Sequence, residues 1–186
     1  RYQVANALAA AAVADALGFS LAEIAAGLGG FHGDDADNPG RAHRFDLGGV
    51  DVIVDFAHNP HGLEAMLNMA CTLPAKRRLV LLGQAGDRED EAIGELARLS
   101  AGAGFDHVII KDMEVHSRGR EKGEVVALLE RELEGAGFSP ERCSHAESEA
   151  AGVEQALEWA QPGDLLLLLV HADRAGVLDR IRALQD

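Results

Sequence analysis

The chain has 186 residues, which is enough for one domain with a sizeable hydrophobic core, alone or with a small appendage. Its formal net charge of -14 at pH 7 argues against nucleic acid and anionic membranes as partners, because both bind to a basic surface. No signal peptide is visible, the late apolar run 165–170 is too short to span a bilayer, and the two cysteines form no C-x-x-C pair. We therefore expect a cytoplasmic protein without a membrane segment or a cysteine-based metal or redox motif.

The first residues predict a small helical hairpin. Residues 4–17 are alanine-rich and favour a helix that ends at Gly18, and Ser20 and Glu23 have the spacing of a capping box for a second helix up to about Leu28. Residues 31–40 are polar and rich in turn residues, which indicates a linker. Because Arg1 is not an initiator methionine and already lies in a predicted helix, we expect a fragment of a longer polypeptide. Its predicted parts are a helical tail at 1–30, a linker at 31–40 and a domain at 41–186.

From residue 41 onward, short apolar runs alternate with helical patterns. The predicted strands are 44–47, 50–56, 78–82, 105–110, 142–145 and 165–170. The predicted helices are 60–72, a helix around the apolar stripe at 93–99, 124–133, 147–159 and 176–184. The Gly48-Gly49 pair predicts an antiparallel hairpin at one edge. Continuous apolar strands alternating with helices predict an α/β fold, with a Rossmann-like, mostly parallel sheet and helices on both faces.

Charged and histidine side chains follow the predicted strands. Because the carboxyl ends of parallel strands lie on one edge of a sheet, these loops should come together. They carry Asp55, His58, Asp87, Arg88, Lys111, Arg118, Arg120, His171, Asp173 and Arg174. Guanidinium groups bind carboxylates and phosphates through two parallel hydrogen bonds, so this edge predicts an anionic ligand. The alternative is a solvated row of surface charges.

Several motifs are incomplete or missing. The glycine-rich segment 83–88 lacks the Lys-Ser/Thr of a P-loop and the third glycine of a dinucleotide fingerprint. No Walker A sequence occurs in the chain, so chemistry on ATP would need phosphate-binding groups supplied from outside it. His58 and His61 are separated by Asn59 and Pro60, and they lack a third ligand, so we expect no metal site.

The stretch Asp55-Phe56-Ala57-His58-Asn59-Pro60, preceded by Gly40-Arg41 and the glycine hairpin, resembles the start of the C-terminal (glutamate ligase) domain of the Mur ligase family. Residues 2–10 resemble the end of the central ATPase domain of that family. The segments 86–91, 118–120 and 123–125 are most similar to the ligase portion of cyanophycin synthetases and their relatives. The Asp-Asn-Pro-Arg and Gly-Lys-Gly-His motifs of many peptidoglycan-building members are replaced here, which argues against a muramyl-peptide substrate.

The resemblance implies an ATP-dependent carboxylate–amine ligase that forms an amide bond through an acyl phosphate. ATP and Mg²⁺ would be held mainly by the central ATPase domain, which also carries the catalytic groups and is missing from this chain, so the fragment alone should be inactive. By motif match, Asn6 would contact the adenine, Arg41 the phosphates and Asp55 the ribose, and His58 would shape that site. The candidates for binding the incoming amino acid or acidic peptide are Asp87, Arg88, Lys111, Arg118, Arg120 and His171.

Two other functions fit the same residues. The domain could bind a nucleotide or an anionic metabolite without ligation, since arginine and lysine suit both tasks. It could also be an interaction domain whose charged edge is only solvated. A P-loop upstream of Arg1 would favour the ligase over both.

Overall fold

The computed structural model describes residues 2–31 and 41–185, and it contains two compact units, residues 1–39 (unit 1) and 40–186 (unit 2). Each unit is described by itself. The predicted linker at 31–40 lies outside the described residues except for Phe31.

Unit 1 is the predicted helical hairpin, formed by α1 (Tyr2–Ala16) and α2 (Leu21–Gly29). The capping box at the start of α2 is confirmed: Ser20 Oγ accepts from Glu23 N at 3.3 Å, and Glu23 Oε2 accepts from Ser20 N at 2.8 Å. No residue of α2 is buried, and Leu8 and Leu17 are among the exposed apolar side chains. The hairpin therefore has well-formed helices and no core of its own.

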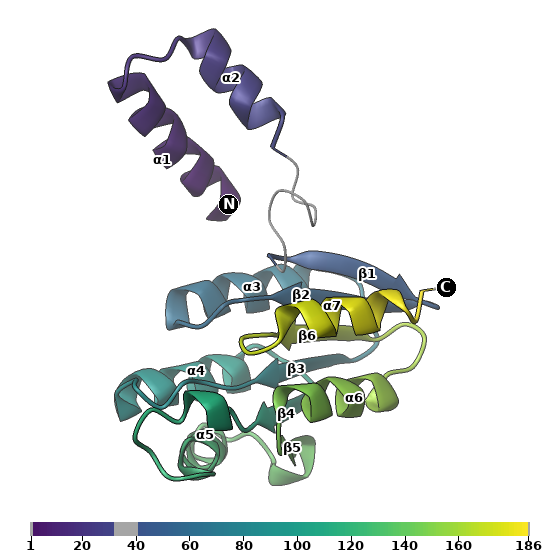
Figure 1. Ribbon diagram of the computed structural model, residues 1–186. Helices are drawn as coiled ribbons and strands as arrows, with labels where there is room; N and C mark the ends of the chain where they lie inside the picture. Colours follow the sequence, from purple (N-terminus) through teal and green to yellow (C-terminus); the bar gives the residue numbers. More distant parts are fainter. Residues whose placement is uncertain (1, 32–40, 186) are drawn as a thin grey trace. The chain divides into compact units, whose positions relative to one another are not determined.

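Unit 2 contains a six-stranded sheet in the order β1-β2-β6-β3-β4-β5 (Figure 1). The strands are β1 (His43–Leu47), β2 (Val50–Asp55), β3 (Arg78–Leu82), β4 (His107–Lys111), β5 (Cys143–Ala146) and β6 (Leu165–Leu169). β1 pairs with β2 antiparallel and every other pair is parallel. Gly48 and Gly49 form the hairpin turn with φ of 62° and 91°, a region where glycine is favoured. The predicted architecture is confirmed.

Helices cover both faces of this sheet (Figure 1). α3 (Pro60–Thr72), α4 (Asp90–Gly102) and α5 (Glu124–Gly135) pack on one face, and α6 (Glu149–Trp159) and α7 (Arg174–Arg182) pack on the other. Short 3-10 turns occupy Glu114–His116 and Pro140–Arg142. In β6, Leu165, Leu167 and Leu169 face the first group of helices while Leu166 and Leu168 face the second. This explains why the strand is apolar at every position.

Most element boundaries shift by one or two residues from the sequence prediction, and two of the shifts have a visible cause. The fourth strand starts at His107 rather than at Phe105, because Arg142 donates from its guanidinium to the carbonyl oxygens of Phe105 and Asp106. Phe105 itself is buried in the core. The last helix begins at Arg174, two residues early, because Asp173 caps it by accepting from Gly176 N at 3.0 Å.

The chain leaves β6 toward the opposite face of the sheet from the chain that leaves its neighbours β2 and β3. The helices that follow β2 and β3 lie on one face of the sheet, whereas α7, which follows β6, lies on the other. Since β6 is inserted between β2 and β3, the loops at its carboxyl end diverge from those of both neighbours. Ligands of open α/β sheets bind in the crevice formed at such a point.

Candidate functional site

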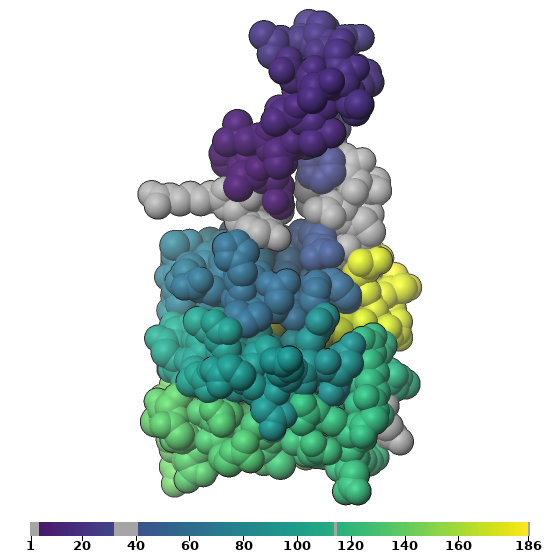
Figure 2. Space-filling model, turned by 90° about the vertical axis from the view of Figure 1, so that its left-hand side faces the viewer, coloured from purple at the N-terminus to yellow at the C-terminus, as the bar shows by residue number. Residues whose placement is uncertain are grey.

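The carboxyl edge of the sheet carries two groups of side chains. We call Arg41, Asp55, Phe56, His58, Gln84 and His171 the β2–β6 cluster, and Asp87, Arg88, Arg118 and Arg120 the β3–β4 loop pair. Figure 2 looks onto this edge of unit 2, where the segments after β2, β3 and β4 run from blue through teal to green. The predicted nucleotide-binding and substrate-binding residues, including Lys111, therefore lie at one end of unit 2, with the exception of Asn6.

Asp55, the last residue of β2, is buried with 7% of its surface exposed. Its Oδ2 accepts from Ala42 N at 2.8 Å, and its Oδ1 accepts from Ala57 N at 2.7 Å. Burial raises the pKa of Asp55, although these two amides and Arg41 favour the ionised carboxylate. Ala42 has a φ of 52°, which is unusual for a residue other than glycine, so the carboxylate fixes a strained entry into β1. Each oxygen keeps a second lone pair, and the predicted ribose contact stays a prediction.

Phe56 is the centre of the β2–β6 cluster. Its ring centroid lies 5.2 Å from that of His58 and 5.4 Å from that of His171. The guanidinium carbon of the exposed Arg41 lies 5.0 Å from the same ring, within the range of a cation–π contact. The side chains of Arg41, His58 and His171 therefore meet on one aromatic ring.

Backbone carbonyls fix the two histidines. Phe56 O accepts from His58 Nδ1 at 3.0 Å, and Ala57 O accepts from His171 Nε2 at 2.9 Å. Gln84, which is buried, adds a bond from the neighbouring loop by donating to His58 O at 2.8 Å. Burial, helped by the charge of Lys111, lowers the pKa of His171 to about 4, so this imidazole is neutral at pH 7.

The β3–β4 loop pair is a different kind of structure. Gly86 N donates to His116 O at 2.9 Å, and a Cβ at Gly86 would lie 1.9 Å from Ser117 O, so only glycine allows this approach. Arg120 crosses the same contact and donates to Gly86 O at 2.9 Å and to Arg88 O at 2.7 Å. It also pairs with Asp90 and Glu124. Arg120 thus holds the two loops together with most of its hydrogen-bonding capacity.

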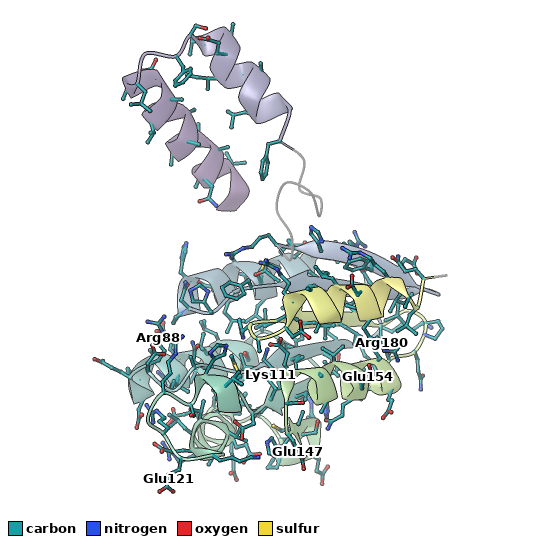
Figure 3. The ribbon with its side chains drawn as sticks, viewed as in Figure 1. Arg88, Lys111, Glu121, Glu147, Glu154 and Arg180 are labelled. Carbon is teal, nitrogen blue, oxygen red and sulfur yellow. The ribbon has the colours of Figure 1, made fainter. Side chains whose placement is uncertain are left out.

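Arg118 and Arg88 remain at the surface. Arg118 forms an ion pair with Asp87 and lowers the pKa of that carboxyl group. Arg88 is exposed and forms no ion pair with any residue in 2–31 or 41–185. In Figure 3 it is labelled at the left-hand end of unit 2, whereas Lys111, which is buried, is labelled near the middle of that unit. Of the arginines in the β3–β4 loop pair, Arg88 is therefore the one whose guanidinium group is available to a ligand.

Lys111 was predicted as a substrate-binding residue, and the structure places it differently from the arginines. It is 1% exposed, and its Nζ donates to Glu149 and to Leu169 O. Sequence reasoning missed Glu149 and Gln84 entirely as members of this edge. Asn6 is exposed on α1, in unit 1.

Within the described parts of the chain, no group of three or more His, Cys, Asp or Glu side chains is arranged to hold a metal ion. The helices in 2–31 and 41–185 include none with the length and apolar character needed to cross a membrane.

Comparison with known proteins gives the family. Residues 40–169 match the model of the Mur ligase, glutamate ligase domain. A cyanophycin synthetase of Trichormus variabilis is 32% identical over 98% of this chain, and a UDP-N-acetylmuramyl-tripeptide synthetase of Deinococcus radiodurans is 34% identical over 90% of it. The chain spans 20% and 33% of these two relatives.

A solved structure of E. coli FolC in complex with DHPP and ADP has a TM-score of 0.69 at 24% identity, and covers 97% of this chain and 39% of the other. A murein peptide ligase of Psychrobacter arcticus has a TM-score of 0.64 at 22% identity, with coverage of 98% and 37%. These two likenesses concern the fold. On the strength of the matched domain and of the curated relatives, the chain belongs to the Mur ligase family, with residues 40–169 forming its glutamate ligase domain.

Proposed function

We propose that this chain is the part of an ATP-dependent carboxylate–amine ligase that closes over the nucleotide and binds the incoming amino acid. In this reaction the carboxylate takes the γ-phosphoryl group of ATP and ADP leaves. The amine then attacks the acyl phosphate, so that an amide forms and inorganic phosphate departs. The ligases among the relatives support this class, and the sequence supplies no P-loop of its own.

The observation that carries the proposal is the meeting of Arg41, His58 and His171 on Phe56, beside the carboxyl end of β6. An exposed guanidinium next to an aromatic ring suits a nucleotide, because the cation attracts phosphate oxygens and the ring offers an apolar face. Arg41 would contact the phosphates and His58 the edge of the nucleotide. Asn6 and Asp55 keep their predicted roles at the adenine and the ribose.

The β3–β4 loop pair supports the second half of the proposal. Arg88 is exposed on this edge, and Arg118 is half-exposed beside Asp87. A carboxylate is the group common to all incoming amino acids, and a guanidinium binds it through two parallel hydrogen bonds. The similarity to cyanophycin synthetases makes an amino acid added to an acidic peptide the first substrate class to test.

The test is ADP release by the longest native polypeptide that contains this chain, measured across amino acids and acidic peptides. Arg41→Ala should lower kcat/KM for ATP. The control is Arg44→Ala, which removes an exposed arginine of β1 that pairs with Asp51 of β2, and it should leave kcat/KM unchanged. The chain of 186 residues alone should release no ADP. Turnover by the chain alone, or an unchanged kcat/KM in Arg41→Ala, would overturn the proposal. Saturable nucleotide binding without ADP release by the longer polypeptide would favour the non-catalytic binding module.

A further inference from the structure

Glu149, the first residue of α6, is a buried carboxylate surrounded by donors. It is 5% exposed and accepts from three successive backbone amides: His171 N at 2.6 Å, Ala172 N at 3.0 Å and Asp173 N at 2.8 Å. Three successive amides that converge on one point form an anion-binding concavity. Here that concavity is filled by a side chain of the protein itself.

Lys111 completes the arrangement from β4. Its Nζ donates to Glu149 and to Leu169 O, the last carbonyl of β6. The side chain passes so close to Gly83 that a Cβ there would lie 2.6 Å from Lys111 Cγ. Two charges and three amides thus join β4, α6 and the loop after β6 at one buried point.

Both groups are charged at pH 7. Burial lowers the pKa of Lys111 to about 8, against the attraction of Glu149. Burial alone would raise the pKa of Glu149, but the charge of Lys111 and the amides of His171 and Asp173 outweigh it and lower that pKa. The site is therefore an ion pair with a full set of charge-assisted hydrogen bonds.

The loop that Glu149 holds carries His171. The backbone of His171 is fixed by Glu149, and its ring is fixed by Ala57 O and by the contact with Phe56. A carbonyl oxygen can only accept, so Nε2 carries the proton and Nδ1 keeps its lone pair. Nδ1 is buried and has no hydrogen-bond partner among the described residues. The imidazole is thus held in one tautomer and one orientation by its surroundings.

We propose that Lys111, Glu149 and the amides of residues 171–173 form an anion clamp that sets the loop between β6 and α7 and so positions His171 against Phe56 in the β2–β6 cluster. Lys111 and Glu149 are then positioning residues and do not touch the ligand. The step from loop geometry to ligand binding rests on the function proposed above, whereas the clamp itself does not.

The three amides distinguish the clamp from a simple buried ion pair. A buried ion pair can often be replaced by two apolar side chains without loss of stability. In Lys111→Met/Glu149→Leu, however, the amides of His171, Ala172 and Asp173 would lose their acceptor, and buried donors without an acceptor are costly. The double variant should therefore remain less stable than the wild type and should lose the order of this loop.

The decisive experiment uses the 186-residue chain without any nucleotide. Glu149→Ala should shift or broaden the amide NMR signals of residues 171–173 and the ring ¹⁵N signals of His171. Acetate, which replaces the removed carboxylate, should restore these signals and raise Tm with saturation, and chloride at equal ionic strength should not. Glu147→Ala is the matched control, since Glu147 is exposed two residues earlier and should leave the loop unchanged (Figure 3).

Unchanged loop signals in Glu149→Ala, or rescue by chloride as complete as by acetate, would overturn the clamp. If Glu149→Ala does not fold, Glu149→Gln keeps the shape and one acceptor oxygen, and the same His171 signals decide the matter. Nucleotide binding is measured separately on the longest native polypeptide that contains this chain, as the wild type and as each variant. If the wild type does not bind nucleotide, the proposed function is wrong and the anion clamp is unaffected. If a variant has a displaced loop but binds nucleotide with wild-type affinity, the clamp does not influence nucleotide binding.

Discussion

The two groups of side chains on the carboxyl edge are built in opposite ways. In the β2–β6 cluster, Asp55, His58 and His171 bond mainly to backbone amides and carbonyls. In the β3–β4 loop pair, Arg120 also bonds to backbone carbonyls, but Arg118 and Asp87 bond to each other at the surface. Backbone partners fix a side chain in one place. Two exposed side chains that bond to each other can separate, and each can then bind a ligand or water instead. The comparison suggests a rigid half and an adaptable half of one binding edge.

The largest expected effect breaks the rigid half at the anion clamp. Lys111→Ala leaves the carboxylate of Glu149 buried without its counter-ion, and should lower the free energy of unfolding by about 3–5 kcal/mol. Urea unfolding measures this. Lys76→Ala is the control, because Lys76 is exposed on the opposite edge, and it should stay within about 0.5 kcal/mol of the wild type. A loss for Lys111→Ala no larger than that of the control would contradict the role given to this lysine.

Acid should weaken the rigid half through His171. The pKa of about 4 in the folded protein lies below the ordinary 6.5, so the folded state binds fewer protons than the unfolded one between these values. Stability from the neutral imidazole is therefore present above pH 6.5 and is lost as the pH falls through 4, by at most about 3 kcal/mol. Lys111, Glu149 and His58 are the charged or titratable groups that act on this ring.

His171→Gln isolates that contribution, because glutamine can donate to Ala57 O and does not titrate. The free energy of unfolding of the wild type should fall more steeply than that of His171→Gln between pH 6.5 and 4. Parallel curves for the two proteins would be evidence against a depressed pKa at His171.

A smaller effect is expected where the two loops of the adaptable half touch. Gly86→Ala places a Cβ against Ser117 O and should force the loops apart, at a cost of about 1–3 kcal/mol. Gly102→Ala is a matched control at the end of α4, where a Cβ meets nothing within 4 Å, and it should be neutral or slightly stabilising. Thermal unfolding of both variants tests the prediction. An equal Tm for the two would show that the loops are not in contact.

The smallest effect concerns the exposed pair. Arg118→Ala should change the free energy of unfolding by less than about 1 kcal/mol, and the difference from the wild type should shrink further at 1 M salt. A salt-independent loss of several kcal/mol would place Arg118 with the rigid half, and the comparison between the two halves would then fail.

The sequence predicted the fold well because its signals were local. The strand that ends at Asp55, the cap at Asn59 with Pro60 behind it, and the glycine hairpin each specify their own geometry within a few residues. The Mur ligase resemblance, which matched motifs along most of the chain, agreed with the family model over 40–169.

The site was harder, because burial and pairing depend on distant residues. Lys111 looks like Arg118 in the sequence, since both follow the same apolar run. Lys111, however, is the last residue of β4, and strand alternation turns it toward α6, where Glu149 meets it. The two residues are 38 apart, and no spacing rule connects them. Gln84 was missed for the same reason, as its partner His58 belongs to another loop.

The position of β6 has a consequence for how the protein is made. β6 lies between β2 and β3, yet it is the last strand in the chain, and Asp51 of β2 aligns with Leu165. Contacts between residues so far apart in sequence form slowly, and during synthesis β2 and β3 must wait with unpaired edges until Leu169 has left the ribosome. A nascent chain that stalls before residue 165 leaves one apolar edge of β2 and one of β3 unpaired, and should depend on chaperones more than the size of unit 2 suggests.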